Sequence, residues 1–529
     1  MRSSRFLLPA VLFSTAFAKI DWSPCNETES TPLFARFQCA TLDVPFDYTS
    51  PSSTETLSLQ LIKIPAPLGS KGSILANPGG PGQPGRSGIA QLASPLIPLT
   101  GGEYDIISFD TRGTENTIPF ECTQNEIDQY AMYKAMVPGN SSEGAIGTLW
   151  ARGTIDAEQC AANASRVGSV LTTAFVARDM MQIVDALEED GLLRYWGLSY
   201  GATLGATVAA MFPDRMDKII LDGVQNPHEY YHSTANIEEW TDADAAFSDL
   251  FAHCVKAGPE LCPLAAHNKT AAALEEMTWR FLDRVKTHPI PVGPMLLDYS
   301  GLKGYFQQTM YGMRNWPNLI KLLNNLLFNV EYDDMEITLQ TTAQTLSTDP
   351  SLREAARRAT ISLAGIYCGD NQVRTESLHD FQPTIRALYN TSRLSGDGGL
   401  GSYMGCQQWR ISPKEVYRGP FSARTKTPLL IIGNTLDSHT PLKSAYNVSA
   451  GYEGSVVLEV NGNGHASSSV PSMCLFEKTT TFWKDGTLPE EGTVCERDVE
   501  PFTGVWWPEV LREGGVDEAL LVYDLEASA

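Results

Sequence analysis

Short apolar runs alternate with longer segments of helical spacing along most of this chain. Each run is rich in β-branched or aromatic residues, and glycine or polar residues follow it before an amphipathic pattern begins. The runs lie at 72–76, 104–109, 192–198, 218–221, 429–432 and 456–460. This alternation predicts an α/β fold with a mainly parallel sheet, because parallel strands need helical crossovers to connect them.

The pattern changes between residues 225 and 427. Long helical patterns such as 270–286 and 351–364 dominate there, and few strand signals occur. Because the strand pattern then resumes, we predict a helical lid at 225–427 inserted into one α/β core, whose two parts are 19–224 and 428–529. An independent helical domain is the alternative.

The first residues have the pattern of a secretory signal peptide. Arg2 and Arg5 form a basic region, 6–13 is apolar, and 16–18 reads Ala-Phe-Ala, a small-residue cleavage site. An uncleaved membrane anchor is the alternative, but the apolar run is too short to cross a hydrocarbon core of about 30 Å. We therefore predict that residues 1–18 are removed, that the protein is secreted, and that no membrane span remains.

Composition and charge narrow the function classes. The 529 residues are 43% hydrophobic and include 10 Trp, 19 Tyr and 20 Phe, which is enough apolar surface for a large core. The 39 basic and 62 acidic residues give a net charge of −23. Such a charge repels phosphate backbones, so the sequence predicts no nucleic-acid partner.

The cysteines and glycosylation sequons fit an oxidising secretory route. The 10 cysteines are even in number and contain no C-x-x-C motif. Pairing them in sequence order would give five disulfides, a hypothesis beside crossed pairing or a free thiol. Exposed N-x-[ST] sequons would accept glycans. The sequons lie at Asn26, Asn140, Asn163, Asn268, Asn390 and Asn447.

The strongest chemical motif is a G-x-S-x-G sequence at 197–201. It follows the apolar run 192–198 and precedes the small-residue segment 202–207. A serine nucleophile on a strand-to-helix turn needs glycines on both sides, because side chains there would clash with neighbouring backbone. The motif therefore predicts Ser199 as a catalytic nucleophile.

A serine hydroxyl needs a base that is oriented by an acid, and in this fold the acid and then the histidine follow the serine in sequence. Asp437 comes after the apolar run 429–432, and His465 comes after the run 456–460. We predict these two residues as acid and base. His439 is the rival base, but on the same loop as Asp437 it is less able to reach both the acid and Ser199.

Acyl transfer also needs hydrogen-bond donors for the developing oxyanion. The loop 77–82 reads Asn-Pro-Gly-Gly-Pro-Gly and follows the first apolar run, so its backbone can come close to a substrate. We predict the amides of Gly79 or Gly80 and of Tyr200 as the donors. No phosphate-binding loop motif is present, and we expect no cofactor.

A second motif points to a different chemistry. Residues 228–232 read His-Glu-Tyr-Tyr-His, which matches the H-E-x-x-H of zinc peptidases. Zinc catalysis through His228, Glu229 and His232 is therefore an alternative. Pro227 and the tyrosines suggest the entry to the lid instead, and no third ligand is evident, so we expect no metal.

Together the serine-hydrolase motifs resemble the secreted tripeptidyl and prolyl aminopeptidase-like α/β hydrolases, serine peptidases with a C-terminal segment of the tripeptidyl-aminopeptidase (TAP) type. The matching segments are 77–82, 110–113, 197–201, 437–441 and 464–465. The resemblance implies an α/β-hydrolase fold, a triad of Ser199, Asp437 and His465, and cleavage at free peptide N-termini. Pro78 stands where the prolyl relatives carry a histidine, so proline specificity is not implied.

An enzyme that cuts at free N-termini must bind an ammonium group, which calls for carboxylates at the pocket. The candidates are Glu238 and Glu239 near the start of the lid, and Asp370 two residues after Cys368. The alternative function is an esterase or amidase for a small secondary metabolite, since one fold serves both chemistries. The expected partner is a peptide or small-molecule substrate.

Overall fold

The computed structural model describes residues 19–25, 36–123, 125, 128, 137–292, 295–328 and 350–522. Its centre is one ten-stranded sheet in the order β1-β2-β3-β5-β4-β6-β7-β10-β11-β12. The strands are β1 (Ser23–Pro24), β2 (Gln38–Pro45), β3 (Thr56–Ile64), β4 (Ser73–Asn77), β5 (Asp105–Asp110), β6 (Leu193–Leu198), β7 (Met216–Asp222), β10 (Leu430–Leu436), β11 (Val456–Asn463) and β12 (Val494–Glu496).

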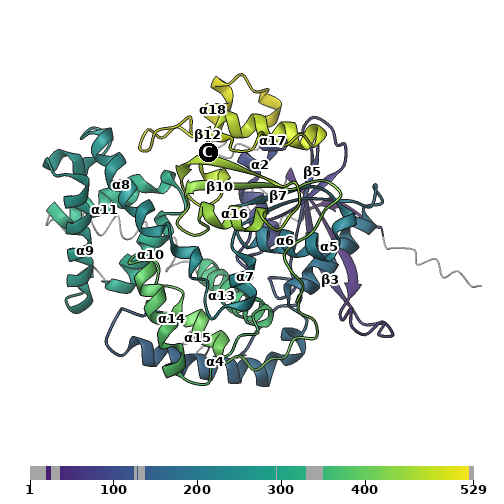
Figure 1. The fold of residues 1–529 in the computed structure, drawn as a ribbon, viewed down its shortest axis with the longest axis horizontal. Helices are drawn as coiled ribbons and strands as arrows, with labels where there is room; N and C mark the ends of the chain where they lie inside the picture. The colour runs from purple at the N-terminus through teal and green to yellow at the C-terminus, as the bar shows by residue number, and fades with distance from the viewer. Residues whose placement is uncertain are drawn as a thin grey trace, which may run out of the picture.

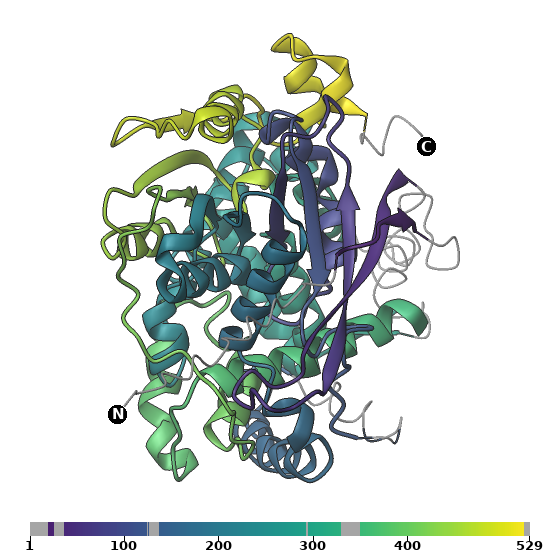
Figure 2. The same ribbon diagram turned by 90° about the vertical axis from the view of Figure 1, so that its right-hand side faces the viewer.

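The sheet is antiparallel at its N-terminal edge and parallel elsewhere. The pairs from β1 to β5 run antiparallel, and every pair from β5 across to β12 runs parallel. Figure 2 shows the purple N-terminal strands at one edge of the sheet. The predicted α/β-hydrolase fold with a mainly parallel sheet is thus confirmed, and the carboxyl ends of the parallel strands share one edge, where such sheets build their sites.

Helices cover both faces of the sheet (Figure 1). One face carries α5 (Thr173–Ala186), α6 (Tyr200–Met211) and α16 (Leu442–Ser449), and the other carries α2 (Ala93–Leu99) and α17 (Met473–Asp485). Each face has its own cluster of buried apolar side chains. β4 is buried along its whole length, as expected of a strand packed on both sides.

Small residues let α6 pack close to the sheet. A Cβ atom at Gly205 would lie 2.5 Å from Leu221 and 2.7 Å from Tyr195, so only glycine fits at this position. This close packing fixes the start of α6, and with it the turn that carries Ser199, against β6 and β7.

Between β7 and β10 the described residues form helices and one small hairpin, and none of them joins the large sheet. The elements are α7 (Pro227–His232), α8 (Ala243–Ala257), α9 (Ala271–Thr287), β8 (Ile290–Val292), β9 (Met295–Leu297), α10 (Tyr299–Thr309), α11 (Trp316–Phe328), α13 (Pro350–Asp370), α14 (Leu378–Thr391) and α15 (Leu400–Gln407). An earlier helix, α4 (Ala145–Gly168), packs against α13 and α15 (Figure 1). The helical layer is therefore built from two stretches of the chain.

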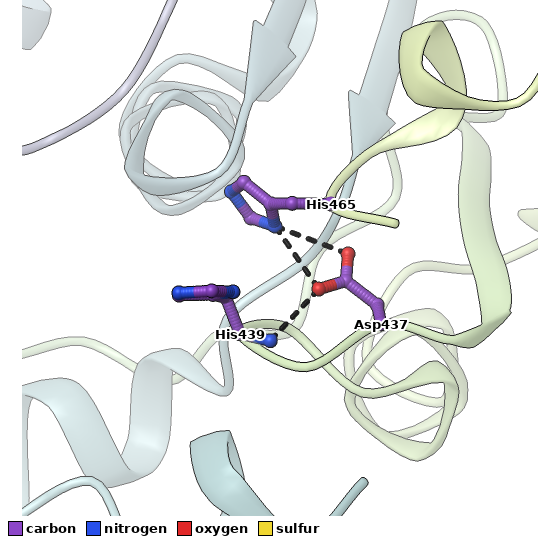
Figure 3. Close-up of side chains that lie close together, drawn as sticks. All are labelled: Asp437, His439 and His465. Atoms are coloured by element: carbon purple, nitrogen blue, oxygen red, sulfur yellow. Dashed lines mark hydrogen bonds and ion pairs between the residues drawn. The ribbon is translucent and has the colours of Figure 1, made fainter. Parts of the chain in front are cut away.

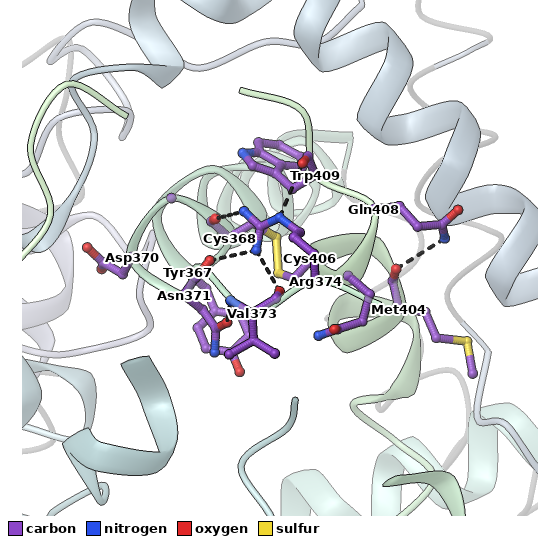
Figure 4. Close-up of a disulfide and its surroundings, with 12 residues drawn as sticks. Tyr367, Cys368, Asp370, Asn371, Val373, Arg374, Met404, Cys406, Gln408 and Trp409 are labelled. Carbon is purple, nitrogen blue, oxygen red and sulfur yellow. Dashed lines mark hydrogen bonds between the residues drawn. A yellow bond between two sulfur atoms is a disulfide. The ribbon is translucent and has the colours of Figure 1, made fainter. Parts of the chain in front are cut away.

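All ten cysteines are paired, and the pairing follows sequence order, which confirms the sequential hypothesis over crossed pairs or a free thiol. The bonds are Cys25–Cys39, Cys122–Cys160, Cys254–Cys262, Cys368–Cys406 and Cys474–Cys495. The Cys368–Cys406 bond joins α13 to α15 within the helical layer (Figure 4).

Within the described ranges, no helix is both long and apolar enough to span a bilayer. The predicted signal peptide at 1–18 and the sequon at Asn26 lie outside those ranges. The remaining sequon asparagines are all exposed: Asn140, Asn163, Asn268, Asn390 and Asn447.

Candidate active site

Ser199 lies on a strained turn between β6 and α6. Its backbone has φ 57° and ψ −126°, a conformation that non-glycine residues rarely adopt. A Cβ at Gly197 would lie 2.1 Å from the Gly201 carbonyl oxygen, and one at Gly201 would lie 2.5 Å from the Asn77 carbonyl oxygen. Both glycines of the motif are therefore required for the sharp turn, as the sequence predicted.

The glycine-rich loop after β4 lies directly against this turn. A Cβ at Gly79 would sit 2.7 Å from Ser199 Cβ and 3.1 Å from the Tyr200 amide nitrogen. The Gly79 amide already donates a hydrogen bond to Asn77 Oδ1 over 2.9 Å. Pro78 and Gly80 are the residues of this loop that line the cavity in front of Ser199. Because proline has no N–H group, the Gly80 amide is the better placed donor for a substrate oxygen.

His465 and Asp437 form a closely bonded pair on neighbouring loops at the carboxyl ends of β11 and β10 (Figure 3). His465 Nδ1 lies 3.1 Å from each carboxylate oxygen of Asp437. This bond occupies Nδ1 and leaves Nε2 as the nitrogen that can accept a proton. The structure thus brings together the two residues that the sequence proposes as acid and base.

Ser199 and His465 line one cavity of about 590 Å³. Its other walls include the loop after β4, residues 308–315 from the end of α10 and the turn before α11, and Trp506 and Pro508. No hydrogen bond between Ser199 and His465 is present among the described residues, which is common in ligand-free hydrolases. The cavity brings the predicted nucleophile and base to the same surface.

A dense set of donors holds the Asp437 carboxylate. Oδ1 accepts the amides of His439 and Thr440 at 2.9 Å each, and Oδ2 accepts the Thr440 hydroxyl at 2.7 Å and the Ala466 amide at 3.0 Å. Burial by itself would raise the pKa of Asp437, but His465 and these hydrogen bonds lower it to about 2. Asp437 is therefore ionised at any pH where the protein would work.

The charge of Asp437 acts on the histidine. Burial alone would lower the pKa of His465, but Asp437 raises it above 6.5, with smaller contributions from Asp222 and Glu239. An imidazolium formed at His465 during proton transfer is thus stabilised. This is the electrostatic role that an acid plays beside a catalytic histidine.

Sequence reasoning missed Thr440. Its hydroxyl lies 2.7 Å from Asp437 Oδ2 and 3.0 Å from His465 Nδ1, so it contacts both members of the pair. The sequence shows only that Thr440 lies three residues after Asp437. That spacing does not predict a contact unless the loop is known to turn back on itself at this point.

His439 is placed differently from His465. Only its backbone amide reaches Asp437, while its Nδ1 lies 2.7 Å from Ser438 Oγ and its ring packs on Tyr311 at 3.9 Å. Burial, and then the neighbouring His465, lower its pKa to about 3. The arrangement favours His465 as the base and keeps His439 neutral beside it.

The described part of the chain contains one group of side chains close enough to share a metal ion, namely Asp437, His439 and His465. However, each Asp437 oxygen already accepts hydrogen bonds from the protein, so an ion here would have to displace the network that holds the acid. The donor set fits an acid and base pair better than a metal site.

The H-E-x-x-H residues do not converge. His228 is exposed and packs edge-on against Phe421, and His232 is also exposed. Glu229 Oε2 accepts the backbone amide of Glu238 over 2.7 Å. This glutamate therefore supports the turn after α7, and the three residues belong to no potential metal cluster of the described chain.

All three predicted ammonium-binding carboxylates have partners inside the protein, and Asp370 and Glu238 are the most firmly held. Asp370 is 1% exposed and accepts the Thr173 amide, the Thr173 hydroxyl and the Tyr230 hydroxyl. Figure 4 shows its side chain pointing away from the Cys368–Cys406 bond. Glu238 accepts hydrogen bonds from Ser444 and Asn447. None of the three predicted carboxylates, Glu239 included, lines the cavity in front of Ser199.

Glu239 is the predicted carboxylate that lies near the base. It accepts hydrogen bonds from Asn236 and Gln225, and it interacts electrostatically with His465. Burial raises its pKa to about 7 against those hydrogen bonds. Its charge also acts on Tyr311, which packs edge-on against His465 at 5.2 Å.

The fold and the position of this site define an α/β hydrolase. The family model described as alpha/beta hydrolase fold matches residues 72–290, and the model described as TAP-like protein matches residues 392–495. The chain therefore contains an α/β-hydrolase domain and a TAP-like domain, in agreement with the resemblance drawn from the motifs.

The chain aligns with curated relatives over nearly their full length. It is 26% identical over 492 residues to serine protease Hip1 from Mycobacterium tuberculosis, covering 90% of this chain and 91% of the relative. It is 23% identical over 509 residues to tripeptidyl aminopeptidase from Streptomyces lividans, covering 92% and 88%. It is also 25% identical over 500 residues to carboxylesterase B from Mycobacterium tuberculosis, covering 90% and 89%.

Proposed function

We propose that this protein is a secreted serine aminopeptidase that releases residues or short peptides from free peptide N-termini through an acyl-enzyme. The observation that carries the proposal is the bond from His465 Nδ1 to both oxygens of Asp437, with His465 and Ser199 on one cavity. The similarity to a serine protease and a tripeptidyl aminopeptidase supports peptides as the substrate class.

In the acylation step, Ser199 Oγ attacks the carbonyl carbon of the scissile bond while His465 Nε2 takes its proton. The amides of Tyr200 and Gly80 donate to the oxygen that becomes negative, and Asp437 stabilises the imidazolium. His465 then protonates the leaving nitrogen as the C–N bond breaks, which leaves an ester on Ser199. Water attacks that ester with His465 as base again, and the N-terminal product leaves with a carboxylate.

Recognition of the free N-terminus is assigned to Glu239. Like Asp370 and Glu238, Glu239 accepts hydrogen bonds inside the protein, from Asn236 and Gln225, but its charge also acts on the base, where it raises the pKa of His465. A substrate ammonium next to Glu239 would lower the raised pKa of this carboxyl and keep it ionised. This coupling would favour peptides with an unblocked N-terminus.

Secretion is part of the proposal. The five disulfides and the exposed sequon asparagines support an oxidising compartment, together with the leader-like sequence at 1–18. Intact-mass measurement of the protein from its native medium tests this point. A chain that starts at Lys19 with no free thiols is expected, and a retained leader would contradict it.

A second candidate function is ester or amide hydrolysis of a small metabolite. It is favoured by the similarity to carboxylesterase B, which extends over as much of the chain as the similarity to the peptidases. Both functions would use the same triad and oxyanion donors, so they differ only in what the rest of the cavity binds.

The deciding experiment is a panel of fluorogenic substrates: free and N-blocked mono-, di- and tripeptide amides, beside short and long acyl esters. The wild-type protein is compared with Ser199→Ala, with a serine-directed phosphonate, and with a chelator. Cleavage of free peptides that is lost on N-blocking and in Ser199→Ala supports the aminopeptidase. Ester turnover with no peptide cleavage would instead support hydrolysis of a small metabolite. Activity that is lost with the chelator but not with the phosphonate would support zinc catalysis through His228 and His232.

A further inference from the structure

A second buried carboxylate, Asp222, lies beneath the candidate site and has no part in the mechanism above. It ends β7 and is 0% exposed. Its backbone carbonyl accepts the Ser199 amide over 2.9 Å, and its Oδ2 accepts Trp196 Nε1 over 3.2 Å. Through these two bonds Asp222 holds the strand and turn that present the nucleophile.

The same carboxylate holds the loop that presents the base. Oδ1 accepts the Ser467 amide over 2.8 Å, and Oδ2 accepts the Ser467 hydroxyl over 2.6 Å. Ser467 is two residues after His465 and starts a short 3-10 helix, Ser467–Ser469. The residue between them, Ala466, donates its amide to Asp437. The two backbone amides that follow His465 therefore donate to two different buried carboxylates: Ala466 to Asp437, and Ser467 to Asp222.

The backbone between these bonds is strained, which shows that the surroundings fix it. Ala466 has φ 59°, in the left-handed region that residues with a Cβ rarely adopt. A Cβ at Gly223 would lie 3.0 Å from Ala466 Cβ, so the loop sits directly against the residue after Asp222. Strain of this kind persists only where neighbouring bonds hold the conformation.

We infer that Asp222 is a positioning residue that fixes the loop carrying His465 against the turn carrying Ser199. The inference rests on the proposed function, because it concerns proton transfer from Ser199 to His465. Errors of about 1 Å in such an alignment can cost about a hundredfold in rate. Asp222 touches neither substrate nor the reacting atoms in this assignment, and it acts through Ser199 and Ser467.

The charge of Asp222 also reaches the base. Burial raises the pKa of Asp222 to about 6, so this carboxyl is ionised at neutral pH. The titratable groups that face His465 are the carboxylates of Asp437, Asp222 and Glu239, the neutral ring of His439 and the phenol of Tyr311. Replacing Asp222 by asparagine removes one of three charges that raise the pKa of His465, so the acid limb of kcat/KM should move to lower pH.

The test uses Asp222→Asn and the milder Ser467→Ala in the full-length protein. Asp244→Asn is the matched control, because the Asp244 carboxylate, like that of Asp222, accepts backbone-amide and serine-hydroxyl hydrogen bonds, here from Arg393, Leu394 and Ser392, but lies in the helical layer. The readouts are kcat and KM, the pH profile of kcat/KM, and the rate at which a fluorophosphonate labels Ser199. The labelling rate reports nucleophile activation without a peptide substrate.

For Asp222→Asn we expect kcat and the labelling rate to fall by roughly ten- to a hundredfold, with KM little changed and the acid limb at lower pH. Ser467→Ala should lower kcat and labelling by a smaller factor, and Asp244→Asn should change neither. If Asp222→Asn has a wild-type kcat and labelling rate and the acid limb of its kcat/KM profile does not move, the inference is overturned. If Asp222→Asn does not fold, unchanged labelling in Ser467→Ala would overturn it instead. Activity that survives Ser199→Ala would refute the proposed function itself, which is a separate outcome.

Discussion

The guanidinium of Arg112 and the carboxylate of Asp179 form a buried two-point ion pair between the loop after β5 and helix α5. Arg112 Nε lies 2.6 Å from Oδ2 and Nη2 lies 2.8 Å from Oδ1, and both side chains are 0% exposed. Arg112 also donates to the backbone carbonyls of Pro45 and Phe46. The pair therefore ties β2, β5 and α5 together on the face of the sheet that carries α6.

Removing one partner of this pair should destabilise the fold strongly. Arg112→Gln leaves the Asp179 carboxylate buried without its counter-charge, so we expect a loss of about 3–5 kcal/mol in the free energy of unfolding. Arg424→Gln is the control, since Arg424 and its partner Glu453 are 80% and 68% exposed and should contribute less than about 1 kcal/mol. Urea unfolding of both variants measures the difference, and equal midpoints would contradict the expectation.

The catalytic histidine can be identified by substitution. We expect His465→Gln to abolish turnover, because Asp437 then has no imidazole to orient and Ser199 has no base. His439→Gln should retain measurable turnover, since only the backbone amide of His439 reaches Asp437. Steady-state rates and circular dichroism on both variants test this, and the reverse pattern would assign the base to His439.

The acid needs a test of its own. Asp437→Asn keeps the shape of the side chain but removes the charge that orients and stabilises His465, so kcat should fall on the order of 10⁴-fold while the protein stays folded. A loss of less than about tenfold would mean that another carboxylate supports the base.

Local sequence was enough to single out the three candidate triad residues. Ser199, Asp437 and His465 each follow an apolar run that becomes β6, β10 or β11, and the carboxyl ends of parallel strands meet at one edge of a sheet. The glycines at 197 and 201 carry their own steric signal. The predicted triad therefore depends only on patterns a few residues long and on the known topology of the fold.

Distant partners limit what the sequence can show. Asp370 was a plausible pocket carboxylate until the fold placed Thr173, 197 residues earlier, against both its oxygens. Asp222 looked like the polar end of one more strand, and its partner Ser467 is 245 residues later. Neither role has a local pattern, because both depend on how strands and loops from separate parts of the chain pack together.

The pH dependence of activity should follow His465. Its pKa is raised above 6.5, since Asp437, and then Asp222 and Glu239, outweigh the effect of burial. The base must be neutral to accept the Ser199 proton, so kcat/KM should fall as pH drops through this raised pKa. Asp437, with a pKa of about 2, stays ionised throughout. Rates at low substrate concentration should therefore give an acid limb with its midpoint above pH 6.5, and a lower midpoint would contradict the pairing.

The raised pKa of His465 also affects the free energy of unfolding, but this contribution decreases as the pH rises, whereas activity increases. A group whose pKa is raised on folding stabilises the protein below its unfolded pKa, and that contribution is lost as pH rises through the folded value. The difference in unfolding free energy between the wild type and His465→Gln should thus be largest below about pH 6.5 and shrink at higher pH. Urea unfolding at several pH values measures it, and a difference that grows with pH would contradict the ion pair.

Recognition of the substrate N-terminus should depend on Glu239. An ammonium bound to a carboxylate contributes about 1.5–3 kcal/mol, so Glu239→Gln should lower kcat/KM for free-N-terminal peptides by roughly ten- to a hundredfold. Acyl esters, which have no ammonium group, should be cleaved at near wild-type rates if the cavity accepts them, and fluorophosphonate labelling of Ser199 should persist. This separates a binding defect from damage to the triad.

Glu238→Gln is the matched control for that substitution. Glu238 is the adjacent carboxylate, but its oxygens accept hydrogen bonds from Ser444 and Asn447. Its neutral form should therefore leave the preference for free over blocked peptides intact, even if stability changes slightly. Equal losses for free and N-blocked peptides in Glu239→Gln, or a larger loss of preference in Glu238→Gln, would remove Glu239 from the ammonium site and leave the metabolite hydrolase as the better account of the cavity.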